Sequence, residues 1–141
     1  MSEHGPIRLL HFADVHIGME NYGRTHACTG LSTRVVDFLR RMDEMIDFAR
    51  EGDVDLAIFA GDAFKTRNPT PTFEREFALR IQELADLCPV VLLVGNHDLP
   101  AIYTRASSIE IYETLNVPNT ILGRGYDLHE VETKRGPVLV A

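Results

Sequence analysis

Three short apolar runs constrain the fold of this chain more than any other feature of its sequence. They cover residues 7–13, 56–60 and 90–94, and the second and third contain only apolar residues. Continuous apolar runs of this length are typical of parallel strands that are covered on both faces. Each run is also shorter than an ordinary helix. The sequence therefore predicts three buried strands that lie side by side.

Two amphipathic segments connect these runs. In residues 34–50 and 71–87, apolar residues recur at steps of three and four, which is the period of a helix with one buried face. Strands that alternate with helices indicate consecutive right-handed crossovers on a largely parallel sheet. The sequence therefore predicts an α/β fold.

Capping residues mark the ends of both predicted helices. Ser32 or Thr33 can cap the start of the first helix, and Gly52 stands just past its end. In the second helix, Thr70 is the expected cap and Pro71 occupies the first helical position. These signals place both helices between the predicted strands.

The pattern changes in the last third of the chain. A weaker helix is predicted over residues 105–115, followed by short strands at 120–122, 128–131 and 138–140. The last of these resembles another buried strand, and the chain stops inside it. We therefore expect a single domain that is incomplete at its C-terminus.

Composition excludes several functional classes. The chain of 141 residues carries 14 Lys+Arg against 21 Asp+Glu, a net charge of −7. This balance argues against a broad basic face that holds nucleic acid by its phosphates alone, but not against a small site charged by bound metal ions. No run approaches the roughly 20 apolar residues of a membrane span, and no secretory signal is evident, so no membrane contact and a cytoplasmic location are expected. Cys28 and Cys88 indicate neither a disulfide framework nor a thiolate metal site.

Acidic, imidazole and amide side chains follow each apolar run at the point where it ends. The first run leads into Asp14 and His16, the second into Asp62, and the third into Asn-His-Asp at residues 96–98. Because the carboxyl ends of parallel strands lie at one edge of a sheet, where ligands bind, we expect these side chains to converge.

The converging groups suit divalent metal ions. Carboxylates crowded in one cleft repel one another unless a cation neutralises them. Oxygen ligands with an occasional imidazole favour manganese, iron, magnesium or zinc. A carboxylate on the central strand can bridge two ions that hold a phosphate and activate a water for in-line attack. Gly61 and Gly95 let the backbone turn so that the next side chain points into the cleft.

Each motif by itself also has a plain structural interpretation. A carboxylate beside a surface histidine can cap a loop, and Gly-Asp or Gly-Asn pairs make ordinary turns. All three motifs in this order, each at the end of a buried strand, are hard to produce by structural need alone. The combination favours a metal site.

The three motifs together resemble the first three motifs of the calcineurin-like metallophosphoesterases. They are Asp14-x-His16, Gly61-Asp62 and Gly95-Asn96-His97-Asp98. Residues 11–18 and 62–69 are most similar to the SbcD-type DNA repair nuclease subunits, whereas 61–67 depart from the Gly-Asp-x-x-Asp-Arg-Gly block of protein Ser/Thr phosphatases. The resemblance implies a metallophosphoesterase-type sandwich of mixed sheets flanked by helices. Residues 1–141 would form mainly its N-terminal βαβαβ half.

The resemblance also implies a ligand set for two divalent ions. Asp14 and His16 would bind the first ion, Asp62 would bridge the two, and Asn96 would bind the second ion through its amide oxygen. Manganese is the metal that the family implies, with iron, magnesium and zinc as alternatives.

The catalytic roles implied by the resemblance fall on the third motif. His97 would be the general acid beside the leaving oxygen, and Asp98 would orient it. In the family, later histidines that include a Gly-His-x-His motif complete both metal shells, and nothing in this sequence matches them. We therefore expect loose occupancy by a single ion, and negligible turnover, for residues 1–141 alone.

The resemblance implies that the complete protein cleaves DNA phosphodiesters, as an exonuclease or endonuclease in double-strand-break repair, with an SbcC-type ATPase partner. Lys65 and Arg67 follow Asp62 closely, and Arg24 lies in a loop that leaves the same edge, so all three are candidate phosphate contacts. A solvated loop is the plain alternative for Arg24.

A homodimer is a further expectation from the resemblance. The family pairs two subunits through helices in this half of the domain, here residues 34–50 and 71–87. Met42 or Phe73 would supply extra exposed apolar positions.

Two other functions stay open at this stage. One is a non-catalytic module that binds metal or mediates assembly. The other is a phosphoesterase that acts on nucleotides or other small phosphates. A reading frame that continues into the missing histidine motif would favour the enzyme, and a natural stop after Ala141 would favour the module.

Overall fold

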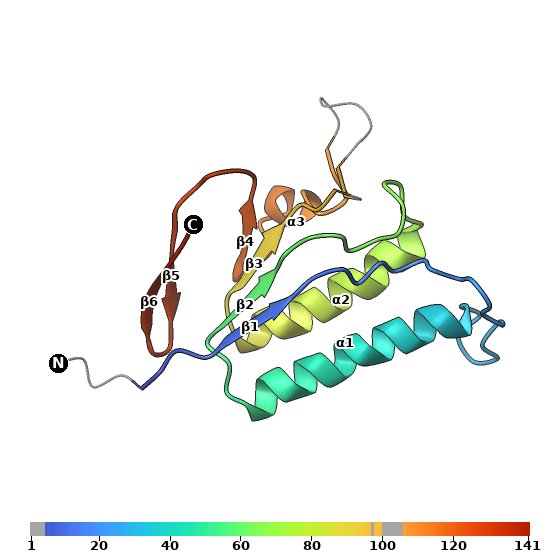
Figure 1. Cartoon of the computed structure of the whole chain (residues 1–141), viewed down its shortest axis with the longest axis horizontal. Helices are drawn as coiled ribbons and strands as arrows, with labels where there is room; N and C mark the ends of the chain where they lie inside the picture. Colours follow the sequence, from blue (N-terminus) through green and yellow to red (C-terminus); the bar gives the residue numbers. More distant parts are fainter. Residues whose placement is uncertain (1–4, 97, 100–105) are drawn as a thin grey trace.

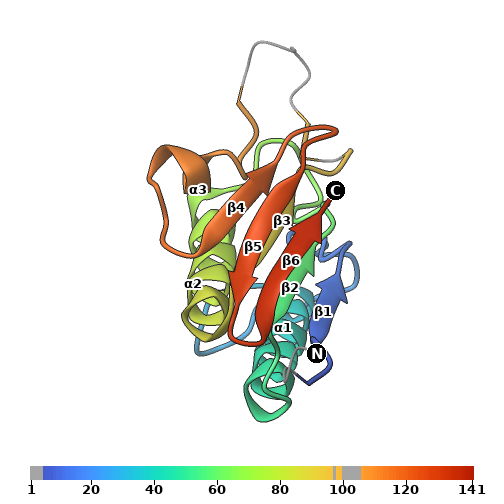
Figure 2. The same ribbon diagram turned by 90° about the vertical axis from the view of Figure 1, so that its left-hand side faces the viewer.

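A four-stranded parallel sheet forms the centre of the computed structural model, which describes residues 5–96, 98–99 and 106–141 (Figure 1). Two long helices cover one face of this sheet. A two-stranded hairpin lies on the opposite face (Figure 2). The described chain is therefore arranged in three layers.

The strands of the central sheet follow the order of the sequence. They are β1 (Leu9–Phe12), β2 (Leu56–Phe59), β3 (Val90–Leu93) and β4 (Thr120–Gly123), and every neighbouring pair is parallel. The prediction of three adjacent parallel strands is confirmed, and the predicted strand at 120–122 joins them as a fourth. The burial of the first strand was predicted wrongly, because β1 is an edge strand whose residues alternate between exposed and half-buried. Because all four strands are parallel, their carboxyl ends lie at one edge of the sheet.

The two long helices begin where their capping residues predict. The helix α1 (Thr33–Glu51) starts after Ser32, whose hydroxyl accepts the N–H of Arg34 at 3.3 Å. The helix α2 (Pro71–Leu87) starts after Thr70, whose hydroxyl accepts the N–H of Phe73 at 3.4 Å. No helix in the described part of the chain is long and apolar enough to cross a membrane.

The end of α1 differs in detail from its prediction. Gly52 does stand at the C-terminal cap, but its φ of −77° is right-handed. The left-handed turn falls one residue later, at Asp53, with a φ of 52°. The third helix is also shorter than the predicted range 105–115. The helix α3 covers only Ile111–Thr114. The first residue of the predicted range is one of residues 100–105, which lie outside the described part of the chain.

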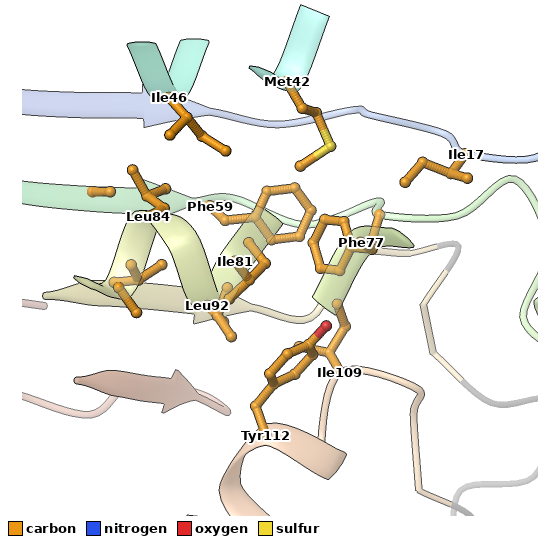
Figure 3. Close-up of a cluster of buried hydrophobic side chains, with 14 of the residues drawn as sticks. Ile17, Met42, Ile46, Phe59, Phe77, Ile81, Leu84, Leu92, Ile109 and Tyr112 are labelled. Carbon is orange, nitrogen blue, oxygen red and sulfur yellow. The ribbon is translucent and has the colours of Figure 1, made fainter. Parts of the chain in front are cut away.

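The main core lies between the sheet and the two helices. The Phe77 ring lies at its centre, with its centroid 5.4 Å from those of Phe59 and Phe64 and 6.3 Å from that of Tyr112 (Figure 3). Met42 points into this core and is only 4% exposed, so the prediction that it offers an exposed apolar position was wrong. Met42 lies on the face of α1 that packs on the sheet, and this packing explains why the apolar period of the helix includes it.

The hairpin forms a second, smaller core on the other face. Its strands are β5 (His129–Thr133) and β6 (Gly136–Val140), which pair antiparallel. Val131 packs against Leu56 and Val91. The predicted last strand is present, but its residues alternate between half-buried and exposed, so its burial on both faces was predicted wrongly.

A buried ion pair ties the tip of this hairpin to the start of β2. The Asp55 carboxylate is 1% exposed, and Nη1 of Arg135 donates to both of its oxygens at 2.7 Å. The backbone N–H of Arg8 donates to the same carboxylate at 2.7 Å. Burial raises the pKa of Asp55, but the Arg8 N–H and the Arg135 guanidinium outweigh this effect and lower the pKa below its ordinary value.

Replacing Asp55 by Asn should lower the melting temperature at pH 7, because Arg135 and the Arg8 N–H lose their charged acceptor. The folded state lowers the pKa of Asp55 from 3.8, so its stabilisation is complete above pH 3.8 and disappears as the pH falls through the folded value. The melting temperatures of the two proteins, measured by circular dichroism, should therefore converge in acid. Asp127→Asn, at an exposed position between β4 and β5, is the control. A difference that does not change with pH would contradict the assignment.

Candidate metal centre

Three of the predicted metal ligands meet at the carboxyl edge of the sheet. Asp14 and His16 follow β1, and Asp62 follows β2. Each offers one ligand atom, and these atoms all lie within 4.8 Å of one another. His16 Nε2 lies 3.3 Å from an Asp14 carboxylate oxygen and 4.0 Å from one of Asp62. The predicted convergence of these two motifs is present in the structure.

Backbone pairing beyond the strands holds these two loops in register. The N–H groups of Asp14 and His16 donate to the carbonyls of Gly61 and Asp62 at 3.0 and 3.1 Å. The parallel pairing continues one step further, where Ile17 pairs with Phe64. The two loops therefore extend the register of the sheet, which fixes where the three side chains start.

The backbone at all three residues is left-handed. The φ angles are 57° at Asp14, 49° at His16 and 61° at Asp62. Such angles are uncommon outside glycine and concentrate at functional sites, where the surrounding structure holds them in place. Here the paired loops supply that constraint.

Two glycines allow the loops after β2 and β3 to touch. A Cβ on Gly61 would lie 2.5 Å from the Cα of Gly95, and a Cβ on Gly95 would lie 2.2 Å from both the backbone nitrogen and a carboxylate oxygen of Asp62. Gly61 also has a φ of 94°, so the predicted need for a sharp turn holds there. At Gly95 the reason is close approach, which the sequence did not reveal.

Asp98 joins the third loop to the second. Its carboxylate is 1% exposed and accepts three backbone N–H groups, from Asp62 at 2.7 Å and from Gly95 and Ala63 at 3.0 Å. Charged hydrogen bonds of this kind are stronger than neutral ones and satisfy the buried carboxylate. Its described contacts are thus with loop backbone. The predicted role of orienting His97 stays a prediction, because His97 lies outside the described residues.

The remaining predicted site residues are exposed. Asn96 lies in the turn between Gly95 and Asp98, and its predicted role as a ligand of a second ion stays a prediction. Lys65, Arg67 and Arg24 are also exposed. None of the three forms an ion pair with any residue that the structure describes.

The three gathered residues fit a divalent ion. Two carboxylate oxygens and one imidazole nitrogen are ligands that manganese, iron, zinc and magnesium accept. Metal–ligand bonds of about 2.0–2.3 Å place two donors of one ion at most about 4.6 Å apart, so a small side-chain adjustment brings all three onto one ion. The side chains of His16 and Asp62 are 24% and 17% exposed and that of Asp14 is 71% exposed, which leaves the site open to solvent on one side.

The family model of the calcineurin-like phosphoesterases matches residues 7–136. This chain belongs to the calcineurin-like phosphoesterase family. The match confirms the resemblance and the fold class that the motifs predicted, and phosphoesterases of this family use divalent metal ions.

Several relatives are nucleases or DNA repair proteins by name. The chain is 32% identical to the SbcD subunit of the nuclease SbcCD of Bacillus subtilis over 105 residues, which are 73% of this chain and 25% of the relative. It is 31% identical to the Escherichia coli K12 protein of the same name over 114 residues, 78% of this chain and 25% of the relative. It is 35% identical to the DNA double-strand break repair protein Mre11 of Methanosarcina mazei over 94 residues, 65% of this chain and 14% of the relative. The chain spans about a quarter of the length of the first two relatives.

Replacing Gly95 by Ala should weaken Mn²⁺ binding about tenfold or more, since the new methyl group displaces Asp62 or breaks the contact between the loops. Isothermal titration calorimetry measures the affinity, and circular dichroism checks the fold. Gly125→Ala is the matched control, because a Cβ there meets nothing within 4 Å. A folded Gly95→Ala protein with unchanged Mn²⁺ affinity would show that this contact does not position the ligands.

Proposed function

We propose that this chain supplies the metal-binding part of a DNA nuclease of the SbcD and Mre11 type. The observation that carries the proposal is the cluster of Asp14, His16 and Asp62 at the carboxyl edge of the sheet. The chain belongs to a phosphoesterase family, and the names of its relatives point to DNA as the substrate.

Each residue of the site has a role in the proposed mechanism. Asp14 and His16 would hold one divalent ion, Asp62 would be shared with a second, and Asn96 would hold the second through its amide oxygen. Divalent ions bound there would polarise a phosphodiester and lower the pKa of a water, and manganese is the metal we expect. His97 gives a proton to the leaving oxygen. Asp98 keeps the second and third loops in register through its three backbone hydrogen bonds.

Uncommitted positive charge near the metal cluster supports a nucleic-acid substrate. Lys65 and Arg67 follow Asp62 along the same loop, are exposed, and form no ion pair with the described residues. With a net charge of −7, the chain can attract phosphates only where cations gather locally or where metal neutralises the carboxylates. Arg24, on the loop before α1, is a third phosphate contact in this proposal.

The proposal extends to partners and location. An SbcC-type ATPase subunit and a cytoplasmic location follow from the type of nuclease. A homodimer would use α1 and α2, where the exposed apolar side chains are Phe48 at 67% and Leu79 at 52%. Phe73 is half-buried and packs against the core, so it offers less surface than the sequence suggested.

Residues 1–141 alone should bind Mn²⁺ weakly, with one ion per chain, and should hydrolyse bis-p-nitrophenyl phosphate negligibly compared with the full-length Bacillus subtilis relative. Few ligands are available to hold the metal, because the described acidic and histidine residues form one cluster of three. Asp62→Asn should abolish the Mn²⁺ binding, and Asp37→Asn, on the exposed side of α1, should not. Turnover near that of the relative would contradict the expected shortage of ligands. Mn²⁺ binding unchanged in Asp62→Asn would contradict the site itself, in favour of an assembly module.

Replacing Lys65 and Arg67 together by Ala should flatten the salt dependence of DNA binding by this chain. Each phosphate contact contributes about 0.9 to the slope of log K against log salt for duplex DNA, so the slope should fall by about 2. Fluorescence anisotropy with a short duplex between 50 and 200 mM salt gives the slope. The control replaces Arg41 and Arg50, whose guanidinium groups pair with acidic residues of α1. An unchanged slope, or an equal change in the control, would refute the DNA contacts and leave a phosphoesterase for small substrates.

A further inference from the structure

A shallow cavity of about 340 Å³ lies beside the loop that leads from β2 to α2. Arg67 and Asn68 line it from this loop, and Ser107 and Ser108 line it from the segment before α3. We call it the Ser107 pocket. It shares no lining residue with the cluster of candidate metal ligands.

Two serine hydroxyls at this pocket need a partner. The hydroxyl oxygens of Ser107 and Ser108 are buried, and neither makes a hydrogen bond with the described part of the chain. Ser107 as a whole is only 6% exposed. Buried polar groups in native proteins are almost always hydrogen-bonded, so an unpartnered pair beside a cavity indicates a group that arrives from outside.

The side chains of Arg67 and Asn68, which also line the pocket, form no ion pair or hydrogen bond with the described residues. Arg67 is exposed and forms no ion pair with the described residues, whereas Arg41, Arg80 and Arg135 are all paired. The side chain of Asn68 makes no hydrogen bond to them either. A guanidinium, an amide and two hydroxyls can all donate hydrogen bonds, which is the requirement for binding phosphate oxygens.

The charge of the pocket favours a phosphodiester over a free phosphate. Among the described residues of the lining, Glu74, in the first turn of α2, is the one that is acidic, and it offsets the charge of Arg67. A phosphodiester carries a single negative charge, whereas a phosphate monoester carries about 1.5 to 2. The smaller charge suits a site where one cation faces one carboxylate, with the positive end of the α2 dipole nearby.

An apolar rim completes the pocket. Pro69 and Ile111 line it beside the polar groups, and Ile111 is 53% exposed. Apolar surface next to hydrogen-bond donors fits a ligand that has both an apolar and an anionic part. A deoxyribose joined to a phosphate has this character.

We propose that the Ser107 pocket holds one sugar–phosphate unit of a nucleic-acid strand whose reacting phosphodiester lies at Asp14, His16 and Asp62. The inference rests on the proposed function, since it gives that site a second contact with its substrate. Asp62 and Arg67 lie on the same loop between β2 and α2, so the strand can pass from one position to the other along this loop.

The test is a titration of the ¹⁵N-labelled 141-residue chain with the dinucleotide dTpdT in EDTA, followed by NMR. Without metal, any binding reports on the pocket and not on hydrolysis, so failure here is distinguishable from failure of the nuclease assay. The backbone amides of residues 67, 68, 107 and 108 should shift with dTpdT. They should not shift with thymidine, which lacks the phosphate, and should shift less with inorganic phosphate.

Variants make the assignment specific. Arg67→Ala combined with Ser107→Ala should weaken dTpdT binding about tenfold or more, because a charged contact and a hydroxyl are lost together. Arg41→Ala, whose guanidinium pairs with Glu44 on α1, is the control and should bind as the unaltered chain does. Should the double variant fail to fold, the titration of the unaltered chain still decides. No shift at the four amides, or an equal response to thymidine, would overturn the proposal.

Discussion

Main-chain hydrogen bonds between loops at the carboxyl edge of the sheet are the interaction on which the site depends. The N–H groups of Asp14 and His16 are bound by the loop after β2, and the Asp98 carboxylate binds N–H groups of the loops after β2 and β3. These contacts use backbone groups and the buried Asp98 carboxylate, and none of them uses a side chain of Asp14, His16 or Asp62. The parallel sheet therefore determines the positions of Asp14, His16 and Asp62. A divalent ion needs only a small adjustment of these side chains to bind.

The sequence predicted the features that follow from periodicity and topology. Three apolar runs became neighbouring parallel strands, and Asp14 and Asp62 met because such strands end at one edge. It did not predict the individual side-chain hydrogen bonds between residues far apart along the chain. The backbone partners of Asp98 and the bond from Arg135 to Asp55 depend on three-dimensional packing, which no local pattern encodes.

Different interactions hold the helices and the hairpin on the two faces of the sheet. The helix face depends on a large aromatic core around Phe77, and the helical period located the buried residues that α1 and α2 contribute to it. The hairpin face has a small apolar core and relies on the Arg135–Asp55 pair at its tip. Asp55 precedes β2 and Asp62 follows it, so this anchor lies at the end of the sheet opposite the metal cluster. The ion pair that anchors the hairpin and the candidate metal ligands therefore lie at opposite ends of β2.

The central claim is that Asp14, His16 and Asp62 share one divalent cation. Crystals of this chain grown with Mn²⁺ and measured for anomalous scattering test it most directly. We expect an anomalous peak about 2.0–2.3 Å from a carboxylate oxygen of each aspartate and from an imidazole nitrogen of His16. A structure in which manganese binds elsewhere, or in which these three side chains turn away from one another with the ion in solution, would contradict it.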